Sequence, residues 1–253
     1  MFSIKIIAIL IIASCSLPVI ADDGPPVLPY RPTVLSPAQL PAPGQLELEL
    51  GGLSMKTNEE RRDSVPYQFK LVFSENWGVL FCGDAYVWRR NPDSRISGFG
   101  DASLTLKRAF LLDESTAFGL EYTSRMPSGK GDFRSAKADY TVNVLFSKDI
   151  GDFHLDMNLN TTRIGAPDAG TGSSQTGISS SLSTSLSEKW GVVGELSGTH
   201  QSGTPNNALF LTALTYSPNK RMVIDFGLAK GLNKDSPEWA VFTGIVVPIA
   251  NFW

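Results

Sequence analysis

The chain has 253 residues, a formal net charge of −3 and a sequence pI near 5.5. This mildly acidic balance excludes the strongly basic class of nucleic-acid binders, so no nucleic-acid partner is expected. Beyond the first 21 residues, no stretch approaches the roughly 18 consecutive apolar residues that a membrane-spanning helix needs.

Residues 1–21 have the features of a cleaved secretory signal peptide. Lys5 carries a positive charge, an apolar run extends from Ile6 to Leu17, and Ala21 ends a small-residue cleavage site. The residues before Cys15 loosely fit the alternative, a lipoprotein-processing site at which Cys15 would be acylated. We expect the ordinary cleavage, which leaves Cys82 as the only cysteine and therefore allows no intrachain disulfide.

Residues 22–44 are rich in proline and form a separate piece. The seven prolines are Pro25, Pro26, Pro29, Pro32, Pro37, Pro41 and Pro43. Because each proline fixes φ and removes a hydrogen-bond donor, the segment should be extended and should not join a sheet. We expect a periplasmic segment ahead of the first strand; a docking peptide for a periplasmic partner is the alternative.

From Gln45 onward, apolar and polar residues alternate with a period of two. In residues 153–160, for example, apolar side chains occupy the odd positions and polar ones the even positions. About twelve such segments follow one another, at residues 45–54, 65–73, 78–88, 101–111, 116–124, 138–146, 152–161, 176–186, 189–199, 207–216, 221–230 and 238–250. Alternation over about ten residues is typical of strands that cross a bilayer around a polar interior. The sequence therefore predicts an all-β, antiparallel, up-and-down β-barrel over residues 45–253, in the bacterial outer membrane.

The links between these segments alternate in length. Those after even-numbered segments are short, whereas several after odd-numbered ones are longer, including 56–64, 124–137 and 162–175. Outer-membrane barrels have short turns on the periplasmic side and longer loops outside. An even strand count then places both termini on the periplasmic side.

Aromatic residues flank the short turns and end the chain. They include Phe73, Trp77, Phe110, Phe118, Phe146, Phe153, Trp190 and Tyr216. This placement predicts an aromatic girdle at the periplasmic interface, in contact with outer-membrane lipids. The last alternating segment ends in Trp253, which resembles the signal that the barrel-assembly machinery recognises.

The parity of the alternation assigns a set of polar residues to the barrel interior as candidate pathway residues. These are Glu47, Glu49, Lys70, Asp84, Lys107, Glu121, Asn143, His154, Asp156, Asn158, Glu195 and Asp225. If the lumen is open, their acidic excess should favour cations. The alternative is that they pair with one another and fill the interior.

The predicted outer loops are basic. They carry Lys56, Arg61, Arg62, Arg89, Arg90, Arg95, Arg125, Lys130, Arg134 and Lys137. Arginine side chains suit phosphate groups, so these residues could meet lipid phosphates of the outer leaflet; an ordinary solvated loop surface is the alternative.

An enzyme is the less favoured class. A hydrolase needs a histidine beside a nucleophile, and only His154 and His200 occur, with no serine placed beside either by the sequence. No cysteine and histidine cluster has metal-ligand spacing. We predict no catalytic residue, no metal site and no cofactor.

Several motifs in residues 98–253 resemble a family of outer-membrane transporters named for the meta-pathway of phenol degradation. The motifs are Gly98-Phe99-Gly100-Asp101, residues 126–131, residues 145–149, Gly194-Glu195-Leu196, residues 226–232, residues 236–239 and Phe242-Thr243-Gly244. The resemblance implies a barrel that acts as a channel or transporter for small solutes, including small hydrophobic or aromatic molecules. It implies no catalytic residues. A structural or receptor barrel with a filled lumen, or a barrel lipid hydrolase, are the alternatives.

Overall fold

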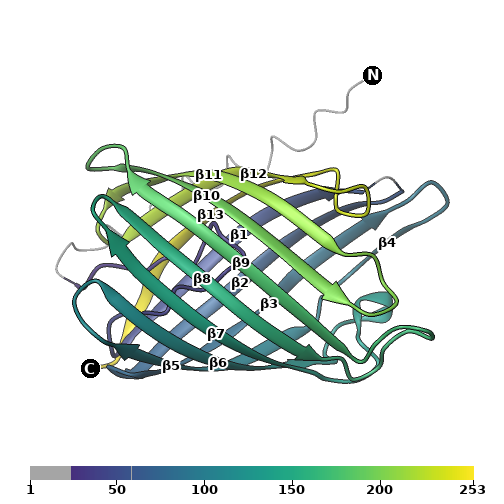
Figure 1. Ribbon diagram of the computed structural model, residues 1–253, viewed down its shortest axis with the longest axis horizontal. Coiled ribbons are helices and arrows are strands. Elements are labelled where there is room, and N and C mark those ends of the chain that lie inside the picture. Colours follow the sequence, from purple (N-terminus) through teal and green to yellow (C-terminus); the bar gives the residue numbers. More distant parts are fainter. Residues whose placement is uncertain (1–23, 58) are drawn as a thin grey trace.

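The computed structural model describes residues 24–57 and 59–253, which form a closed β-barrel (Figure 1). The predicted signal peptide and Cys15 lie outside the described residues. Within the described part of the chain, no helix is both long enough and apolar enough to cross a bilayer.

The barrel wall is built from strands in chain order. They are β1 (Gln45–Lys56), β2 (Arg61–Ser74), β3 (Trp77–Arg90), β4 (Arg95–Gly98), β5 (Ala102–Leu111), β6 (Thr116–Met126), β7 (Asp139–Ile150), β8 (Phe153–Arg163), β9 (Ser174–Ser185), β10 (Trp190–Gln201), β11 (Asn207–Asn219), β12 (Met222–Gly231) and β13 (Trp239–Asn251). A short 3-10 helix, η3 (Gly131–Phe133), lies in the link between β6 and β7.

Apart from β4 and β5, consecutive strands pair antiparallel with each other, and β1 closes the barrel by pairing with β13. The short strand β4 pairs with the end of β3, and β5 pairs with the earlier part of β3, so β4 and β5 together form one wall position. The wall therefore has twelve positions, which confirms the predicted fold class and strand number.

The predicted strands agree with the structure to within a few residues, and the main differences are at the loop end of β2, β3 and β4 and at the short-turn ends of β7 and β11, which run to Ile150 and Asn219. The segments 56–64 and 89–100 were expected to be loops, yet β2 begins at Arg61, β3 reaches Arg90 and β4 starts at Arg95. The register pairs Arg61 with Arg90 and Arg62 with Arg89. Both faces of this extension are polar, so it lacks the alternation that reveals strands elsewhere.

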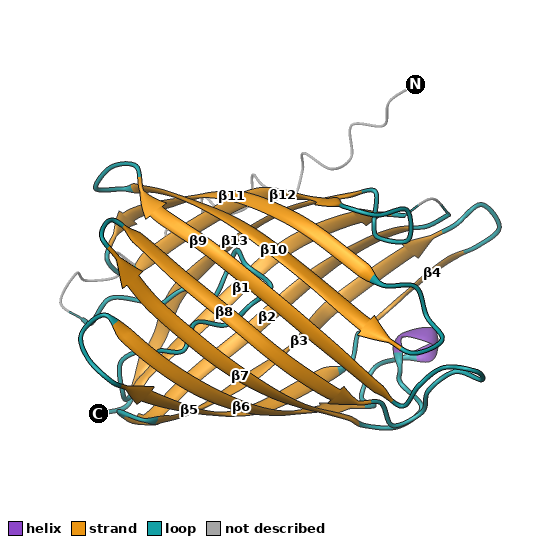
Figure 2. Cartoon of the chain, viewed as in Figure 1, coloured by secondary structure: helices purple, strands orange, loops and turns teal. Residues whose placement is uncertain are grey.

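Short turns and both ends of the barrel wall lie at one end of the molecule. Gln45 at the start of β1 pairs with Asn251 at the end of β13, and the backbone N–H of Phe252 donates to the Gly44 carbonyl over 2.9 Å. The C-terminus lies at this end, whereas η3 and the longer links lie at the other (Figure 2). The predicted asymmetry between the two ends is confirmed.

The outward face of the wall is apolar, and the charged side chains are among the most buried. Leu120, Val144 and Leu159 are outward and 44–60% exposed, while Glu47, Lys70 and Asp225 are fully buried. A water-soluble protein shows the reverse distribution. The exposed apolar surface is far larger than a soluble monomer leaves open, which fits a wall facing hydrocarbon.

An arginine at the middle of this apolar band should destabilise the barrel. Val144 lies halfway along β7 on the outward face. We expect Val144→Arg to lower the free energy of unfolding in lipid vesicles by about 2–4 kcal/mol. Ser124→Arg, near the loop end of β6, is the matched control and should cost at most about 1 kcal/mol. Equal losses in urea titrations of the two variants would contradict a membrane-embedded band.

Candidate functional site

Residues 24–44 lie inside the barrel; we call them the inner segment (Figure 1). Their backbone N–H groups donate to inward side chains from widely separated strands. Tyr30 N–H donates to Glu49 over 2.7 Å, and Val34 N–H donates to Glu195 over 2.9 Å. Residues 24–44 of the expected periplasmic segment therefore contact the inner wall of the barrel.

The prolines explain why the segment needs these side chains. As predicted, the described residues of the inner segment form no strand, so their backbone groups have no sheet partner. A buried N–H or carbonyl group without a partner is costly, and the inward polar side chains supply the partners. Ala38 is fully buried, and its N–H donates to the Ser147 hydroxyl over 2.7 Å.

Two buried lysines hold the middle of the inner segment. Lys70 Nζ lies 2.8 Å from a Glu47 carboxylate oxygen and 2.6 Å from one of Glu49, and it donates to the Leu28 carbonyl. Lys107 Nζ lies 3.3 Å from Glu121. Register explains both pairings, because residue 47 faces residue 70 across β1 and β2, and residue 107 faces residue 121 across β5 and β6.

The aromatic ring of Tyr30 lies between these two lysines. Lys70 Nζ is 4.4 Å from the ring centroid and Lys107 Nζ is 4.1 Å from it. Lys107 also donates to the Pro37 carbonyl. Ammonium groups interact favourably with the faces of aromatic rings, so Tyr30 joins the two ion-pair clusters through the inner segment.

Arg31 links the inner segment to the other side of the barrel. Its guanidinium group forms two hydrogen bonds with the Asp225 carboxylate on β12, of 2.9 and 3.0 Å. It also donates to the Thr243 carbonyl on β13 over 3.1 Å. Such paired bonds fix both position and orientation, so Arg31 anchors the segment at this wall.

The remaining predicted interior residues also face the lumen. Asp84 pairs with Arg62 at 2.6 Å, and the Asn143 amide donates to Glu121 over 3.0 Å. With the side-chain amide of Asn158 oriented so that both its oxygen and its nitrogen form hydrogen bonds, the oxygen accepts from the Ser36 N–H over 2.8 Å. The nitrogen donates to the Ser36 carbonyl over 2.9 Å. The structure thus places all twelve candidates on the inner face, although their role as pathway residues stays a proposal.

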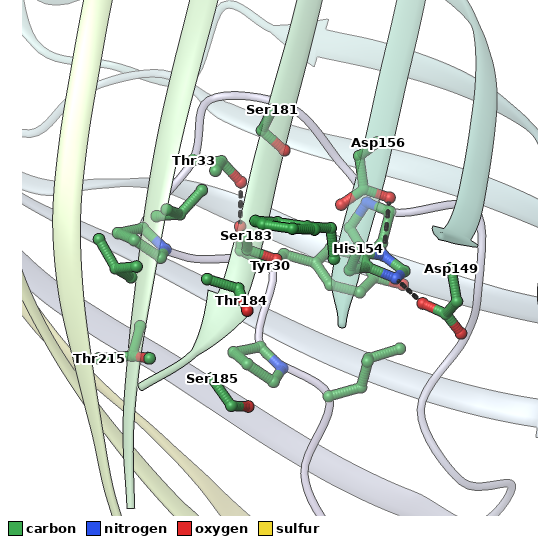
Figure 3. Close-up of a pocket in the computed structure, with 18 of the residues that line it drawn as sticks. Tyr30, Thr33, Asp149, His154, Asp156, Ser181, Ser183, Thr184, Ser185 and Thr215 are labelled. Carbon is green, nitrogen blue, oxygen red and sulfur yellow. Dashed lines mark hydrogen bonds and ion pairs between the residues drawn. The ribbon is translucent and has the colours of Figure 1, made fainter. Parts of the chain in front are cut away.

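His154 bonds two carboxylates. Its Nδ1 lies 2.6 Å from Asp149 and its Nε2 lies 3.2 Å from Asp156 (Figure 3). His200 bonds Asn206 through Nδ1. Among residues 24–57 and 59–253, no serine hydroxyl bonds either ring, so the arrangement that a serine hydrolase requires is missing from this part of the chain.

The inward charges are largely paired. Arg31, Arg62, Lys70 and Lys107 each bind at least one of the seven carboxylates of the candidate set, and Arg89 and Arg125 line the lumen further toward the loop end. Asp156 and Glu195 have no arginine or lysine partner among the described residues. Because these arginines were not among the candidate residues, the net negative charge of the lumen is smaller than the count of the candidates alone suggests.

Three cavities remain around the inner segment. One of about 490 Å³ lies between the inner segment and β8, β9, β10 and β11 at the short-turn end, where Ser181, Ser183 and His154 line it (Figure 3). One of about 340 Å³ lies beside Tyr67 and Cys82. One of about 200 Å³ lies toward the loop end, beside Ser179 and Asn160. The segment narrows the lumen without filling it.

The inner wall also has an apolar patch that the sequence analysis missed. Its buried residues are Val193, Leu211, Ala213, Ala229 and Ala240, with Leu53, Met55 and Phe242 packed against them. The sequence analysis selected polar residues at inward positions, so it did not identify small apolar residues such as Ala213 and Ala229. The lumen therefore has an apolar patch on β10–β13 beside the polar residues Glu195 and Asp225 of the same strands.

Many of the basic residues at the loop end are paired within the chain. Arg90 and Arg61 lie 2.7 and 3.1 Å from Asp63, and Lys56 lies 2.6 Å from Glu238. Arg125 lies 3.4 Å from Asp101. These pairs reduce the basic charge available to lipid phosphates, and the predicted lipid contacts stay a proposal.

Comparison with known proteins identifies the family. A family model described as "Putative MetA-pathway of phenol degradation" matches residues 35–248. The chain belongs to this family. The predicted resemblance covered residues 98–253, so membership extends further toward the N-terminus than the sequence motifs indicated. No curated protein matches the chain's sequence.

Solved structures show the same fold as this family member. The COG4313 outer membrane channel from Pseudomonas putida F1 has a TM-score of 0.69 at 12% identity, covering 88% of this chain and all of that one. The KdgM porin has a TM-score of 0.54 at 9% identity, covering 79% and 99%. KdgM in complex with disordered oligogalacturonate has a TM-score of 0.52 at 9% identity, with the same coverage. The chain is thus an outer-membrane β-barrel in fold.

Proposed function

We propose that this barrel is an outer-membrane channel for small solutes, including small hydrophobic or aromatic molecules. The observation that carries the proposal is that the inner segment narrows the lumen and leaves cavities of about 490, 340 and 200 Å³ around it. A barrel of this size has an interior between a packed core and a narrow channel. The solved barrels of similar fold include one named a channel and one named a porin.

The chemistry of the inner wall supports a solute with both apolar and polar parts. The patch around Leu211 and Phe242 offers apolar contact, whereas Ser181, Ser183 and Asn158 offer hydrogen bonds. Binding sites for small molecules typically combine apolar contact area with a few polar groups that fix orientation. A phenol-like solute has both parts, in keeping with the family's description.

A structural or receptor barrel with a filled lumen is the second candidate. The ion pairs of Lys70, Lys107 and Arg31 with the wall favour it, because they hold the inner segment across the middle of the barrel. Single-channel recording of the whole protein in planar bilayers separates the two. Discrete conductance steps support the channel, and their absence at every applied voltage overturns it.

Arg31 should set part of the ion preference. We expect Arg31→Ala to shift the reversal potential under a potassium chloride gradient toward cation selectivity, because Asp225 loses its only arginine or lysine partner among the described residues. Arg31→Lys keeps the charge and is the matched control. An identical reversal potential in Arg31→Ala and the parent would contradict a path that passes Asp225.

We also propose the cellular setting. The short-turn end would face the periplasm, after removal of residues 1–21 as a signal peptide. The outward aromatic residues beside the short turns, such as Phe118 and Trp190, would lie at the lipid interface. The last strand, which ends near Trp253, would be the part that the barrel-assembly machinery recognises.

A further inference from the structure

Hydroxyl and amide side chains cover much of the inner wall on β8, β9 and β10, between the ionisable residues His154, Asp156 and Glu195. Every second residue of β9 from Ser179 to Ser185 faces inward, and all four are serines. Asn158 and Asn160 face them from β8, and Ser197 and Thr199 from β10. We call this surface the hydroxyl track.

Space remains beside the hydroxyl track, as it does beside Tyr67 and Cys82. The cavity of about 490 Å³ is lined by Ser181, Ser183 and Ser185 and reaches Gly151 and Asp152 at the short-turn end. The cavity of about 200 Å³ is lined by Ser179 and Thr199. Residues 179 and 181 are successive inward positions of β9, so the two cavities adjoin along this strand.

β6 and β7, next to the hydroxyl track, are packed against the inner segment. Ala38 of the inner segment, Ala117 of β6 and Leu145 of β7 form a buried cluster, with exposed fractions of at most 1%. Lys107 is fully buried next to it against Pro37. A solute that crosses the barrel with the inner segment in place has space along β8–β10, where the two adjoining cavities reach from the short-turn end toward the loop end.

Glu195 stands where the two cavities meet. It faces Ser181 in the register of β9 and β10, and its Oε2 accepts the Val34 N–H over 2.9 Å. Its Oε1 is buried and accepts no hydrogen bond of normal geometry, although Ser197 and the Leu35 backbone lie close to the carboxylate. Thr33 lines the first cavity and Val34 the second, so this contact marks the boundary between them. A buried acceptor without a partner is costly, and a hydrogen-bond donor of a solute would satisfy it.

We propose that the hydroxyl track is the solute path, and that it takes uncharged solutes bearing hydroxyl groups, with Glu195 Oε1 accepting a hydrogen bond from the solute. This inference rests on the proposed channel function. Hydroxyl and amide groups both donate and accept hydrogen bonds, so they bind hydroxylated solutes without requiring charge. Asp156, which lines the larger cavity, and Glu195, which lies in the same row of paired residues, disfavour anions there.

Cysteine modification tests the position of the path. In a Cys82→Ser background, Ser181→Cys is compared with Ala117→Cys. The two positions lie in one row of paired residues that runs 117, 147, 156, 181, but Ala117 is on the packed side. A neutral benzyl methanethiosulfonate reagent should reduce the single-channel conductance of Ser181→Cys at least about twofold and leave Ala117→Cys unchanged.

The outcomes separate this inference from the proposed function. One outcome is that the parent protein conducts while Ser181→Cys, shown by mass spectrometry to be modified, keeps its conductance. That result contradicts the hydroxyl track as the solute path but leaves the proposed channel function intact. If the parent itself does not conduct, both fall. A larger effect of the reagent at Ala117→Cys than at Ser181→Cys would also overturn the path.

A neutral and an anionic solute of similar structure test whether the path prefers uncharged solutes. Phenyl glucoside and phenyl glucuronide differ in one carboxylate, and swelling of proteoliposomes reports the entry of each. We expect the neutral glucoside to enter about threefold faster or more, and Glu195→Gln to reduce this ratio. Equal entry rates through the parent protein would overturn the proposed preference for uncharged solutes.

Discussion

Deletion of residues 24–41 should raise the single-channel conductance several-fold. The inner segment crosses the lumen, and its backbone bonds Glu49, Glu195 and Ser147 on three separate parts of the wall. Without the inner segment, we expect water to fill the middle of the barrel. The deletion leaves residues 42–44 in place, so the contact between Gly44 and Phe252 at the barrel end is preserved. Planar-bilayer recordings of the two proteins give the comparison.

The deletion has a folding control. Heat-modifiable migration on a gel shows whether the shortened protein still forms a closed barrel, as β1 with its partners β2 and β13 is retained. A folded deletion variant with parental conductance would show that the inner segment does not limit the path. A milder variant, Tyr30→Ala with Arg31→Ala, removes two anchors and should show brief openings of intermediate size.

Replacement of Lys70 by methionine should lower the free energy of unfolding by about 3–5 kcal/mol. Lys70 is fully buried and lies within 2.8 Å of both Glu47 and Glu49. The substitution leaves two buried carboxylates close together without their shared cation, and it removes a donor from the Leu28 carbonyl. Urea titration of the protein in vesicles, followed by tryptophan fluorescence, measures the loss.

Lys56→Met is the matched control. Lys56 also forms a close ion pair, at 2.6 Å from Glu238, but both side chains are at least 32% exposed. Exposed pairs contribute about 0–1 kcal/mol, so the control should change little. A third variant that combines Lys70→Met with Glu47→Leu and Glu49→Leu removes the unpaired charges and should recover part of the loss. Equal effects of Lys70→Met and Lys56→Met would contradict a buried network.

The ion pairs of the lumen link the stability of the barrel to the width of the solute path. Lys70 and Lys107 pair with wall carboxylates and also donate to the Leu28 and Pro37 carbonyls of the inner segment. Arg31 belongs to the inner segment and pairs with Asp225 on the wall. The groups that neutralise the lumen are therefore the groups that hold the segment in place. Weakening them should both destabilise the barrel and widen the path.

The sequence by itself determined the barrel. Alternation over segments such as 153–160 requires one polar and one apolar face, and the strand length and the unequal links then leave few arrangements. It also identified inward residues such as Glu47, Lys70 and Asp225, because the parity of a strand fixes which face each side chain occupies. It was less successful at β4 and the ends of β2 and β3, where both faces are polar.

Only the tertiary structure decided what the interior contains. The prolines of residues 24–44 predict an extended chain without sheet partners, and that holds equally for a segment in the periplasm and for one inside a barrel. Its position depends on contacts between residues far apart in the chain, such as Arg31 with Asp225 and Val34 with Glu195. Periodicity reports only local conformation, so it shows which residues face inward but not which of them meet across the lumen, nor where space remains.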